Sequence, residues 1–172
     1  MIGRDGYMIP KKIHYCWFGK GKKSKLALKC IRSWRQYCPE YEVIEWNEEN
    51  FDIDMNGYTR MCYAEKKYAY LSDYVRLWVV EKYGGIYFDT DVEVIRSLEE
   101  LLRNDAFFCF ENKQYVASGL GFGSVAHGKV IQAMLKEYEI LLDGKNGVRM
   151  CPKLNTQALV ALGLKQNGRK QN

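Results

Sequence analysis

The chain has 172 residues, of which 47% are hydrophobic and 14% aromatic, so it is long enough for one domain with a core and too apolar to be disordered. No apolar run approaches the ~18 residues of a membrane span, and residues 1–8 lack the basic-then-apolar pattern of a signal peptide. We therefore expect a soluble, cytoplasmic protein. The six cysteines form no C-x-x-C pair and there are only two histidines, which argues against a structural zinc site and predicts reduced core thiols.

Strand and helix patterns alternate along the chain. The first half predicts a strand at 12–18, a helix at 25–37, a strand at 41–46, a short helix within 57–67 and a long helix at 67–82. The second half predicts a strand at 86–89, a short helix at 97–103 capped by Ser97, strands at 106–110 and 115–117, a glycine-rich loop at 118–124, and helices at 129–142 and 154–162. This alternation predicts an α/β fold with a mainly parallel, mixed sheet flanked by helices. We expect a single domain over 9–165, with flexible ends at 1–8 and 166–172.

The stretch at 83–94 reads YGGIYFDTDVEV, in which a glycine turn and a short aromatic strand lead into Asp89 and Asp91. Buried unpaired carboxylates are costly, and a divalent cation would offset that cost. Because residues i and i+2 of an extended chain point to the same side, we expect Asp89 and Asp91 to converge on one ion. Hard oxygen ligands favour Mg²⁺ or Mn²⁺ with open positions for phosphate oxygens. The alternative is that the two acids cap a helix or pair with Arg or Lys.

Asp73 and Arg76 are three residues apart in the predicted helix at 67–82, so they share a face. One interpretation is a local ion pair. The other is that Asp73 accepts, and Arg76 donates, hydrogen bonds to polar hydroxyls of a ligand. Tyr70, Leu71 and Tyr74 flank the two residues, which favours a position close to the core, where an isolated pair would be costly.

The first predicted strand ends in Cys16, Trp17 and Phe18, and open α/β sheets bind ligands at the carboxyl ends of their strands. Trp17 either stacks on a base, whose edge the backbone of 16–18 would read, or packs as an ordinary core aromatic. A later motif, GFGSVA at 121–126, fits G-x-G-x-x-A only weakly, because no suitable acid follows about twenty residues on. We expect it to be a loop that lines a sugar site.

The net charge of +5 is unevenly placed, because nine Lys and Arg residues and no acid lie between positions 11 and 35. This run is either a solvated helix face or a surface that attracts an anionic substrate, a phospholipid surface or nucleic acid. We rank nucleic acid low, since the charges belong to one helix and loop and no RNA-binding signature accompanies them. We therefore expect no nucleic-acid partner.

Several motifs occur in a distinctive order. They are IPKKIHYCWFG at 9–19, CIRSW at 30–34, YE at 41–42 with WNE at 46–48, KKYAYLSDYVR at 66–76 and GGIYFDTDV at 84–92. This ordered set resembles glycosyltransferase family 32, the DXD-containing sugar transferases, whose bacterial members are often labelled capsular polysaccharide synthesis proteins. The resemblance covers about 9–110 well and extends loosely to about 164.

The resemblance implies a GT-A fold, a Rossmann-like α/β domain that binds a nucleotide-sugar and Mn²⁺ or Mg²⁺. It implies that Asp91 is the direct metal ligand, and that Asp89 touches the ribose or donor sugar and reaches the metal through water. Asp73 and Arg76 would hold the sugar hydroxyls and the diphosphate, and the segment 16–18 would hold the base. The resemblance thus supplies four catalytic candidates, which are Asp73, Arg76, Asp89 and Asp91.

The implied function is metal-dependent, retaining transfer of a hexose from a UDP- or GDP-sugar to an oligosaccharide or lipid-linked saccharide acceptor in capsular or cell-surface polysaccharide synthesis. The basic first loop suits an acceptor on a lipid diphosphate, so we expect a peripheral contact with the inner membrane face. Family members usually run on past this length, and late polar residues, often histidines, complete their metal site. This chain has no histidine after His127. The alternative is therefore a C-terminally truncated module that binds a nucleotide-sugar without turnover.

Overall fold

The computed structural model describes residues 8–171, so the predicted leader lies outside the described residues except for Met8, as does residue 172. A sheet with the strand order β2-β1-β3-β5-β4 forms its centre. The strands are β1 (Lys12–Cys16), β2 (Glu42–Trp46), β3 (Gly85–Tyr87), β4 (Ala106–Phe108) and β5 (Phe122–Ser124). β1 pairs in parallel with β2 and β3, whereas β5 pairs antiparallel with β3 and β4. The predicted α/β fold with a mixed sheet is confirmed, and its parallel pairing is confined to β1, β2 and β3.

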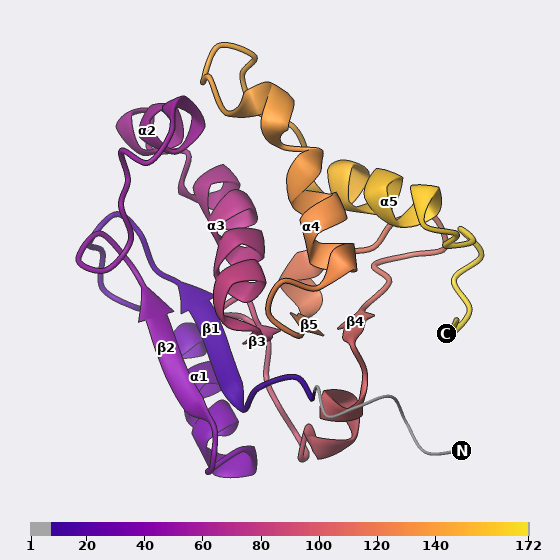
Figure 1. The fold of residues 1–172 in the computed structure, drawn as a ribbon. Coiled ribbons are helices and arrows are strands. Elements are labelled where there is room, and N and C mark those ends of the chain that lie inside the picture. Colours follow the sequence, from indigo (N-terminus) through magenta and orange to yellow (C-terminus); the bar gives the residue numbers. More distant parts are fainter. Residues whose placement is uncertain (1–7, 172) are drawn as a thin grey trace.

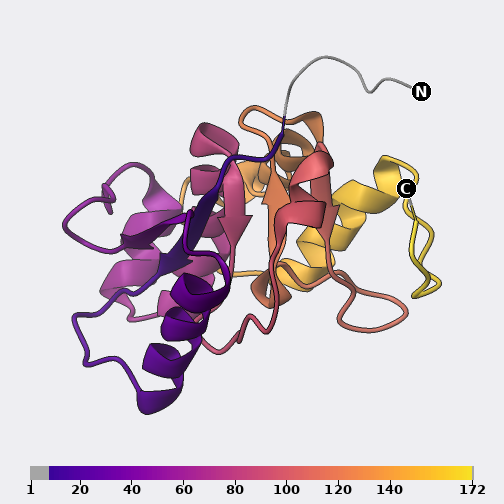
Figure 2. The same ribbon diagram turned by 90° about the horizontal axis from the view of Figure 1, so that it is seen from below.

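Helices cover both faces of this sheet (Figures 1 and 2). They are α1 (Lys25–Tyr37), α2 (Gly57–Ala64), α3 (Tyr68–Tyr83), α4 (Lys129–Lys136) and α5 (Cys151–Ala161), with the short 3₁₀ turns η1 (Glu99–Arg103), η2 (Ser118–Leu120) and η3 (Glu139–Leu141). α1 lies on one face, and α3 lies on the other beside α4 and α5. Within residues 8–171, no helix has the length and apolarity that crossing a membrane would require.

Alternating side chains along the strands divide the core in two. Ile13 and Tyr15 of β1 belong to the cluster on the α1 side, whereas Cys16 belongs to the cluster on the α3 side. In β3, Ile86 belongs to the cluster on the α1 side and Tyr87 to the cluster on the α3 side. The sheet is therefore buried on both faces, which explains why these strands read as apolar runs in the sequence.

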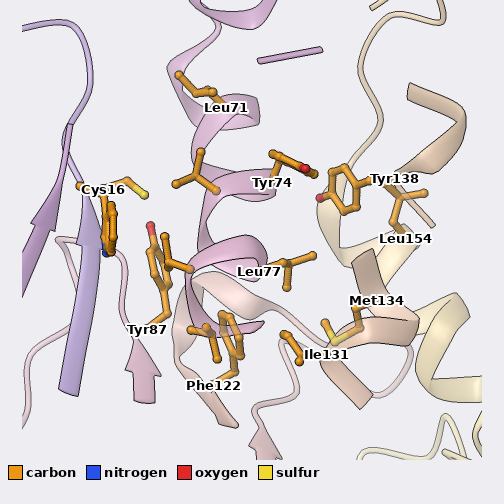
Figure 3. Packing of buried hydrophobic residues seen from close by; sticks show 14 of the residues in the cluster. Cys16, Leu71, Tyr74, Leu77, Tyr87, Phe122, Ile131, Met134, Tyr138 and Leu154 are labelled. Carbon is orange, nitrogen blue, oxygen red and sulfur yellow. The ribbon is translucent and has the colours of Figure 1, made fainter. Parts of the chain in front are cut away.

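The larger cluster connects the sheet to three helices (Figure 3). Tyr87 and Phe122 come from β3 and β5, Leu77 from α3, Met134 from α4 and Leu154 from α5, and all five are buried. The C-terminal helices thus pack on the same core that holds β3. Any residue placed just after β3 is therefore fixed in position by segments that are distant in the sequence.

Single residues explain where α1 begins and where α3 ends. Ser24 caps α1 by accepting a hydrogen bond from the Ala27 amide at 3.0 Å. Gly84 ends α3 in the left-handed region with φ of 62°, where a Cβ would also crowd Pro10. The chain therefore leaves α3 and enters β3 within one residue.

The predicted glycine loop at 118–124 is wrong, because this segment contains η2 and the inner antiparallel strand β5. Gly123 lies at the centre of β5, where a Cβ would collide with the Phe107 ring. Phe122 stacks on Phe108 of β4 with ring centroids 5.7 Å apart. β5 has only three residues, one of them a glycine, which is too short for a periodic pattern that would predict a strand. Its pairing with β3 and β4 stabilises the strand.

Other predicted bounds also need correction. The strand at 115–117 is reduced to an isolated bridge between Phe110 and Val116, and the strand at 106–110 ends at Phe108. Ser97 does not cap an α-helix, since the helical residues that follow form η1. The helix at 129–142 is divided into α4 and η3, and the helix at 154–162 begins earlier, at Cys151. The strand at 86–89 ends at Tyr87, so Asp89 lies beyond it.

His14 is fully buried in β1 and its two ring nitrogens have different partners. The Trp46 indole N–H donates to Nδ1 at 3.1 Å, and Nε2 donates to the Gly84 carbonyl at 2.8 Å. Because an indole nitrogen only donates and a carbonyl only accepts, these bonds select the neutral ring. Burial lowers the pKa of His14 from 6.5 to about 4, although the Gly84 hydrogen bond opposes the shift.

We therefore expect acid to destabilise the fold through His14. Between pH 6.5 and about 4 the unfolded chain binds a proton that the folded chain excludes, so stability falls with pH across this window, by about 3 kcal/mol in total. Urea unfolding at a series of pH values measures this slope. His14→Gln should flatten it. Equal slopes in wild type and His14→Gln would refute the assignment.

Candidate active site

β1 and β3 end beside α3 (Figure 1). Residues from these three segments line one pocket. The pocket has a volume of about 360 Å³, which is in the range of small-ligand sites. Its lining residues are Cys16, Trp17 and Phe18 at and after the end of β1, Tyr68, Ala69, Ser72 and Arg76 of α3, and Tyr87, Asp89, Thr90 and Asp91 at and after β3. The structure therefore brings together residues 16–18, Arg76, Asp89 and Asp91 as predicted. Asp73 and the predicted sugar-lining segment 121–126 do not line this pocket.

The two acids reach the pocket through a turn and not through an extended strand. The Val92 amide donates to the Asp89 carbonyl at 3.1 Å, which closes a turn over the intervening residues. The prediction that Asp89 and Asp91 converge because they alternate along a strand is therefore wrong in its geometry. Asp89 is partly buried with its side chain 38% exposed, and Asp91 is exposed. Both carboxylates nevertheless border the same pocket.

Arg76 is a buried cation shared by two carboxylates. Its Nη2 lies 2.9 Å from Asp73 Oδ1 and 3.1 Å from Asp89 Oδ1, and its side chain is only 5% exposed. Its Nε donates to the Ser72 carbonyl at 3.1 Å, and the guanidinium lies 4.9 Å from the Tyr87 ring centroid. Burial alone would lower the pKa of Arg76, but Tyr87, Asp89 and Asp73 raise it well above its usual value, so the group stays charged.

Asp73 is directed at Arg76, so the local ion pair that the spacing allowed is present. Burial raises the pKa of Asp73, and Arg76 opposes this shift. The predicted contact between Asp73 and a donor sugar stays a prediction. The guanidinium of Arg76 thus pairs with both Asp73 and Asp89, whereas Asp91 has no ion pair with it. Three carboxylates and one cation leave an excess of negative charge at the pocket, which favours binding of a cation.

The carboxylates suit a divalent metal of one particular kind. Over residues 8–171, no three His, Cys, Asp or Glu side chains are grouped closely enough to form a complete metal site. Mg²⁺ and Mn²⁺ sites often use only one or two carboxylates and take their other ligands from substrate phosphates and water. Tyr87 and Arg76 both bind Oδ1 of Asp89, which leaves its Oδ2 free of them. Asp91 and Asp89 therefore fit a metal that a phosphate-bearing ligand brings with it.

The end of β1 and the residues after it form another part of the pocket lining. Trp17 is partly buried, packs at the edge of the core on the α1 side and also lines the pocket, while its stacking on a base stays a prediction. Its indole N–H donates to the Gly21 carbonyl at 2.7 Å, and Lys23 Nζ lies 5.5 Å from its ring centroid. Phe18 is buried against Phe51. Burial raises the pKa of the Cys16 thiol to about 12, so this thiol is neutral.

Sequence reasoning missed a buried polar layer behind Arg76. Ser118 Oγ lies 3.4 Å from Arg76 Nη1 and accepts a hydrogen bond from Asn155 Nδ2 at 3.0 Å. Cys151 Sγ lies 3.2 Å from the same hydroxyl. Asn155 and Cys151 belong to α5, in which Cys151, Leu154, Asn155, Ala158 and Leu159 are buried at helical spacing. A polar residue in such an apolar stripe is the signal that would have indicated this layer.

The backbone of Gly119 packs directly against Asp89. Its carbonyl accepts a hydrogen bond from the Asp89 amide at 3.1 Å. A Cβ at this position would overlap Asp89 Oδ2 and lie 3.1 Å from Arg76 Nη1. Glycine at 119 therefore lets the η2 backbone pass directly beneath the carboxylate.

We expect Gly119→Ala to displace the Asp89 carboxylate and weaken Mn²⁺ binding about tenfold, as loss of a supporting residue around a metal typically does. Calorimetry with Mn²⁺ in the presence of a nucleoside diphosphate measures this effect. Gly21→Ala is the matched control, since a Cβ there meets nothing within 4 Å. An unchanged affinity in Gly119→Ala would show that Asp89 does not depend on this packing.

Comparisons with known proteins identify the family of this chain and its fold. The family described as "Glycosyltransferase sugar-binding region containing DXD motif" matches residues 24–108, about half of the chain. Inositol phosphoceramide mannosyltransferase 3 of Schizosaccharomyces pombe is 32% identical over 106 residues, which are 58% of this chain and 29% of that protein. Human alpha-1,4-N-acetylglucosaminyltransferase is 32% identical over 101 residues, 56% of this chain and 27% of that protein.

Two further comparisons extend this picture. Mannosyl phosphorylinositol ceramide synthase of Saccharomyces cerevisiae is 31% identical over 108 residues, 58% of this chain and 27% of that protein. The matches thus span less than a third of each curated relative. Among solved structures, the PaToxG glycosyltransferase has a TM-score of 0.71 over 91% of this chain and 70% of that one, at 18% identity, which shows a shared fold. The chain belongs to the family of glycosyltransferases whose sugar-binding region contains a DXD motif, here Asp89-Thr90-Asp91.

Proposed function

We propose that this chain is a metal-dependent glycosyltransferase that moves a hexose from a UDP- or GDP-sugar to a saccharide acceptor. The observation that carries the proposal is the pocket itself. Two carboxylates of the DXD motif line one wall, Trp17 lines another, and the buried Arg76 fixes Asp89 between them. Such a pocket offers a metal–diphosphate end and an aromatic surface for a base.

Each side chain has a separate part in this proposal. Asp91, the exposed acid, holds the metal, and Asp89 holds the ribose or donor sugar and supports the metal through water. Arg76 pairs with Asp89 and orients it, with Asp73 as the second partner of the guanidinium. Trp17 stacks on the base. Bound Mn²⁺ or Mg²⁺ would neutralise the charge that grows on the diphosphate as it leaves the sugar.

We further propose that transfer retains the configuration at the anomeric carbon. The sugar would pass through an oxocarbenium-like state, with the acceptor attacking from the face that the diphosphate leaves and that phosphate taking the proton. The protein groups that line the pocket support this route, because Asp89 and Asp91 are assigned to the sugar and the metal and the other lining side chains include no activated nucleophile. The Cys16 thiol is neutral, and burial raises the pKa of the Tyr87 hydroxyl well above its usual value.

The acceptor is proposed to be a saccharide carried on a lipid. The names of both yeast relatives refer to phosphate-bearing ceramide lipids, which supports an acceptor of this class. Synthesis of a capsular or other cell-surface polysaccharide in the cytoplasm, at the inner face of the membrane, is the setting that we propose for it. The sugar is a hexose, as in the mannosyl and N-acetylglucosaminyl transfers that the relatives' names describe.

Calorimetry and product analysis with UDP- and GDP-linked mannose and N-acetylglucosamine test the proposal. We expect one donor to bind only with Mn²⁺ or Mg²⁺ and to be hydrolysed or transferred slowly. Metal-dependent binding without release of the nucleotide would instead favour the alternative, a nucleotide-sugar-binding module without turnover. If no donor binds with either metal, both proposals fail.

A further inference from the structure

The basic run at 11–35 is divided by the fold into paired and unpaired cations. Four of its lysines have carboxylate partners, namely Lys11 with Glu40 and Glu99, Lys12 with Glu42, Lys23 with Glu45 and Lys29 with Glu93. The other five have no carboxylate within 4 Å in the part of the chain that the structure describes, and all are exposed. They are Lys20, Lys22, Lys25, Arg32 and Arg35, which we call the basic face.

The basic face is continuous along α1 and the loop before it. α1 buries Ala27, Cys30, Ile31 and Trp34 against the sheet, so its lysines and arginines point to the opposite side. Two leucines of the same helix stay outside the core, Leu26 at 54% and Leu28 at 44% exposure. Figure 2 shows α1 at the outside of the molecule, with no other helix over its outer side.

This surface adjoins the mouth of the DXD pocket. The loop of Lys20 and Lys22 is attached to the pocket wall, because Gly21 between them accepts the hydrogen bond of the Trp17 indole. On the other side, Lys29 of α1 pairs at 2.7 Å with Glu93, two residues after Asp91. A partner that binds the basic face therefore lies beside the pocket where the sugar would be transferred.

We infer that the basic face docks this chain onto an anionic phospholipid surface, an inference that rests on the proposed function for its purpose but not for its test. Unpaired lysines and arginines at one surface attract anionic headgroups, and each adds to the binding. Leu26 and Leu28 favour a membrane over a nucleic acid, because apolar side chains gain from entering the headgroup region and have no partner along a phosphate backbone. Docking in this orientation sets the pocket mouth at the surface in which a lipid-linked acceptor diffuses.

Vesicle co-sedimentation tests the inference with the whole chain. Binding to vesicles of phosphatidylcholine with phosphatidylglycerol should exceed binding to pure phosphatidylcholine by at least about tenfold, and should fall as salt rises. Changing Lys20, Lys22, Lys25 and Arg32 to Gln should remove that preference. The matched control changes four exposed cations elsewhere to Gln, Lys113, Lys145, Arg149 and Lys153, and should keep it. Leu26→Ser with Leu28→Ser should weaken binding that remains at high salt.

The outcomes separate this inference from the proposed function. Asp91→Asn should bind anionic vesicles like the wild type, and the basic-face variant should hydrolyse a soluble donor at the wild-type rate, so each idea can fail alone. Equal binding to both vesicle types, or equal loss in the basic-face and control variants, would overturn the docking surface. Competition by single-stranded RNA that releases the chain from vesicles, with tighter binding to RNA than to lipid, would also overturn it in favour of a nucleic-acid site.

Discussion

Replacing Asp91 by Asn is expected to lower metal-dependent donor hydrolysis or transfer by about 10²–10³-fold. The change keeps the size of the side chain and removes the charge of the one DXD acid that lies outside the Arg76 ion pairs. Since Asp91 is exposed and lies in a turn, its replacement should leave the free energy of unfolding within about 0.5 kcal/mol of wild type. Initial rates at saturating Mn²⁺, together with thermal unfolding, measure the two effects.

Two variants make this prediction specific. Asp54→Asn removes another exposed acid, one that pairs only with Arg60 at 3.2 Å, and should keep full activity. Asp89→Asn should lose activity and also some stability, because Asp89 is a partner of the buried Arg76. Wild-type activity in Asp91→Asn would remove the metal role from this residue.

Replacing Arg76 by Met is expected to destabilise the fold by about 3–5 kcal/mol, because it leaves Asp73 and Asp89 without their shared cation. Urea unfolding measures the loss. The matched control Arg60→Met breaks an exposed pair and should cost less than about 1 kcal/mol. Asp73→Asn added to Arg76→Met should recover part of the stability, since it removes one of the stranded charges.

The loss in Arg76→Met should also depend on pH in a defined direction. Burial raises the pKa of Asp73 in the folded state above that of the unfolded chain. Protonation of Asp73 therefore favours folding, and this contribution is present at low pH and lost as pH rises through the folded pKa. Without Arg76 the ionised form is still less favourable, so the variant should be less impaired near pH 4 than at pH 7. A loss that is equal at both pH values would show that Asp73 is not stranded.

Much of the fold could be predicted where local signals and tertiary packing agree. The predicted helix at 25–37 coincides with α1, because its amphipathic pattern matches the face that packs on the sheet and Ser24 caps its first turn in the structure. β5 could not be predicted, since its three residues contain a glycine and gain their stability from pairing with β3 and β4. Short strands that depend on distant partners carry little information of their own.

The side chains of the candidate site that line the pocket were predictable, whereas the buried polar residues behind Arg76 were not. Asp89, Asp91, Arg76 and Trp17 stand out because charge or a large ring at a strand end or in an apolar helix has a cost that requires an explanation. Ser118 has no such signature, and Asn155 is marked only by its position in the apolar stripe of α5. Their role depends on contacts between segments 42 and 37 residues apart, which only the packing of α5 and η2 against α3 reveals.

The most direct test of the central claim is a crystal structure of this chain with Mn²⁺ and the UDP- or GDP-sugar that binds in calorimetry. We expect Mn²⁺ between the diphosphate and Asp91, the base against Trp17, and Arg76 still paired with Asp89 behind the sugar. A nucleotide bound elsewhere on the chain, or a metal bound without Asp91, would contradict it.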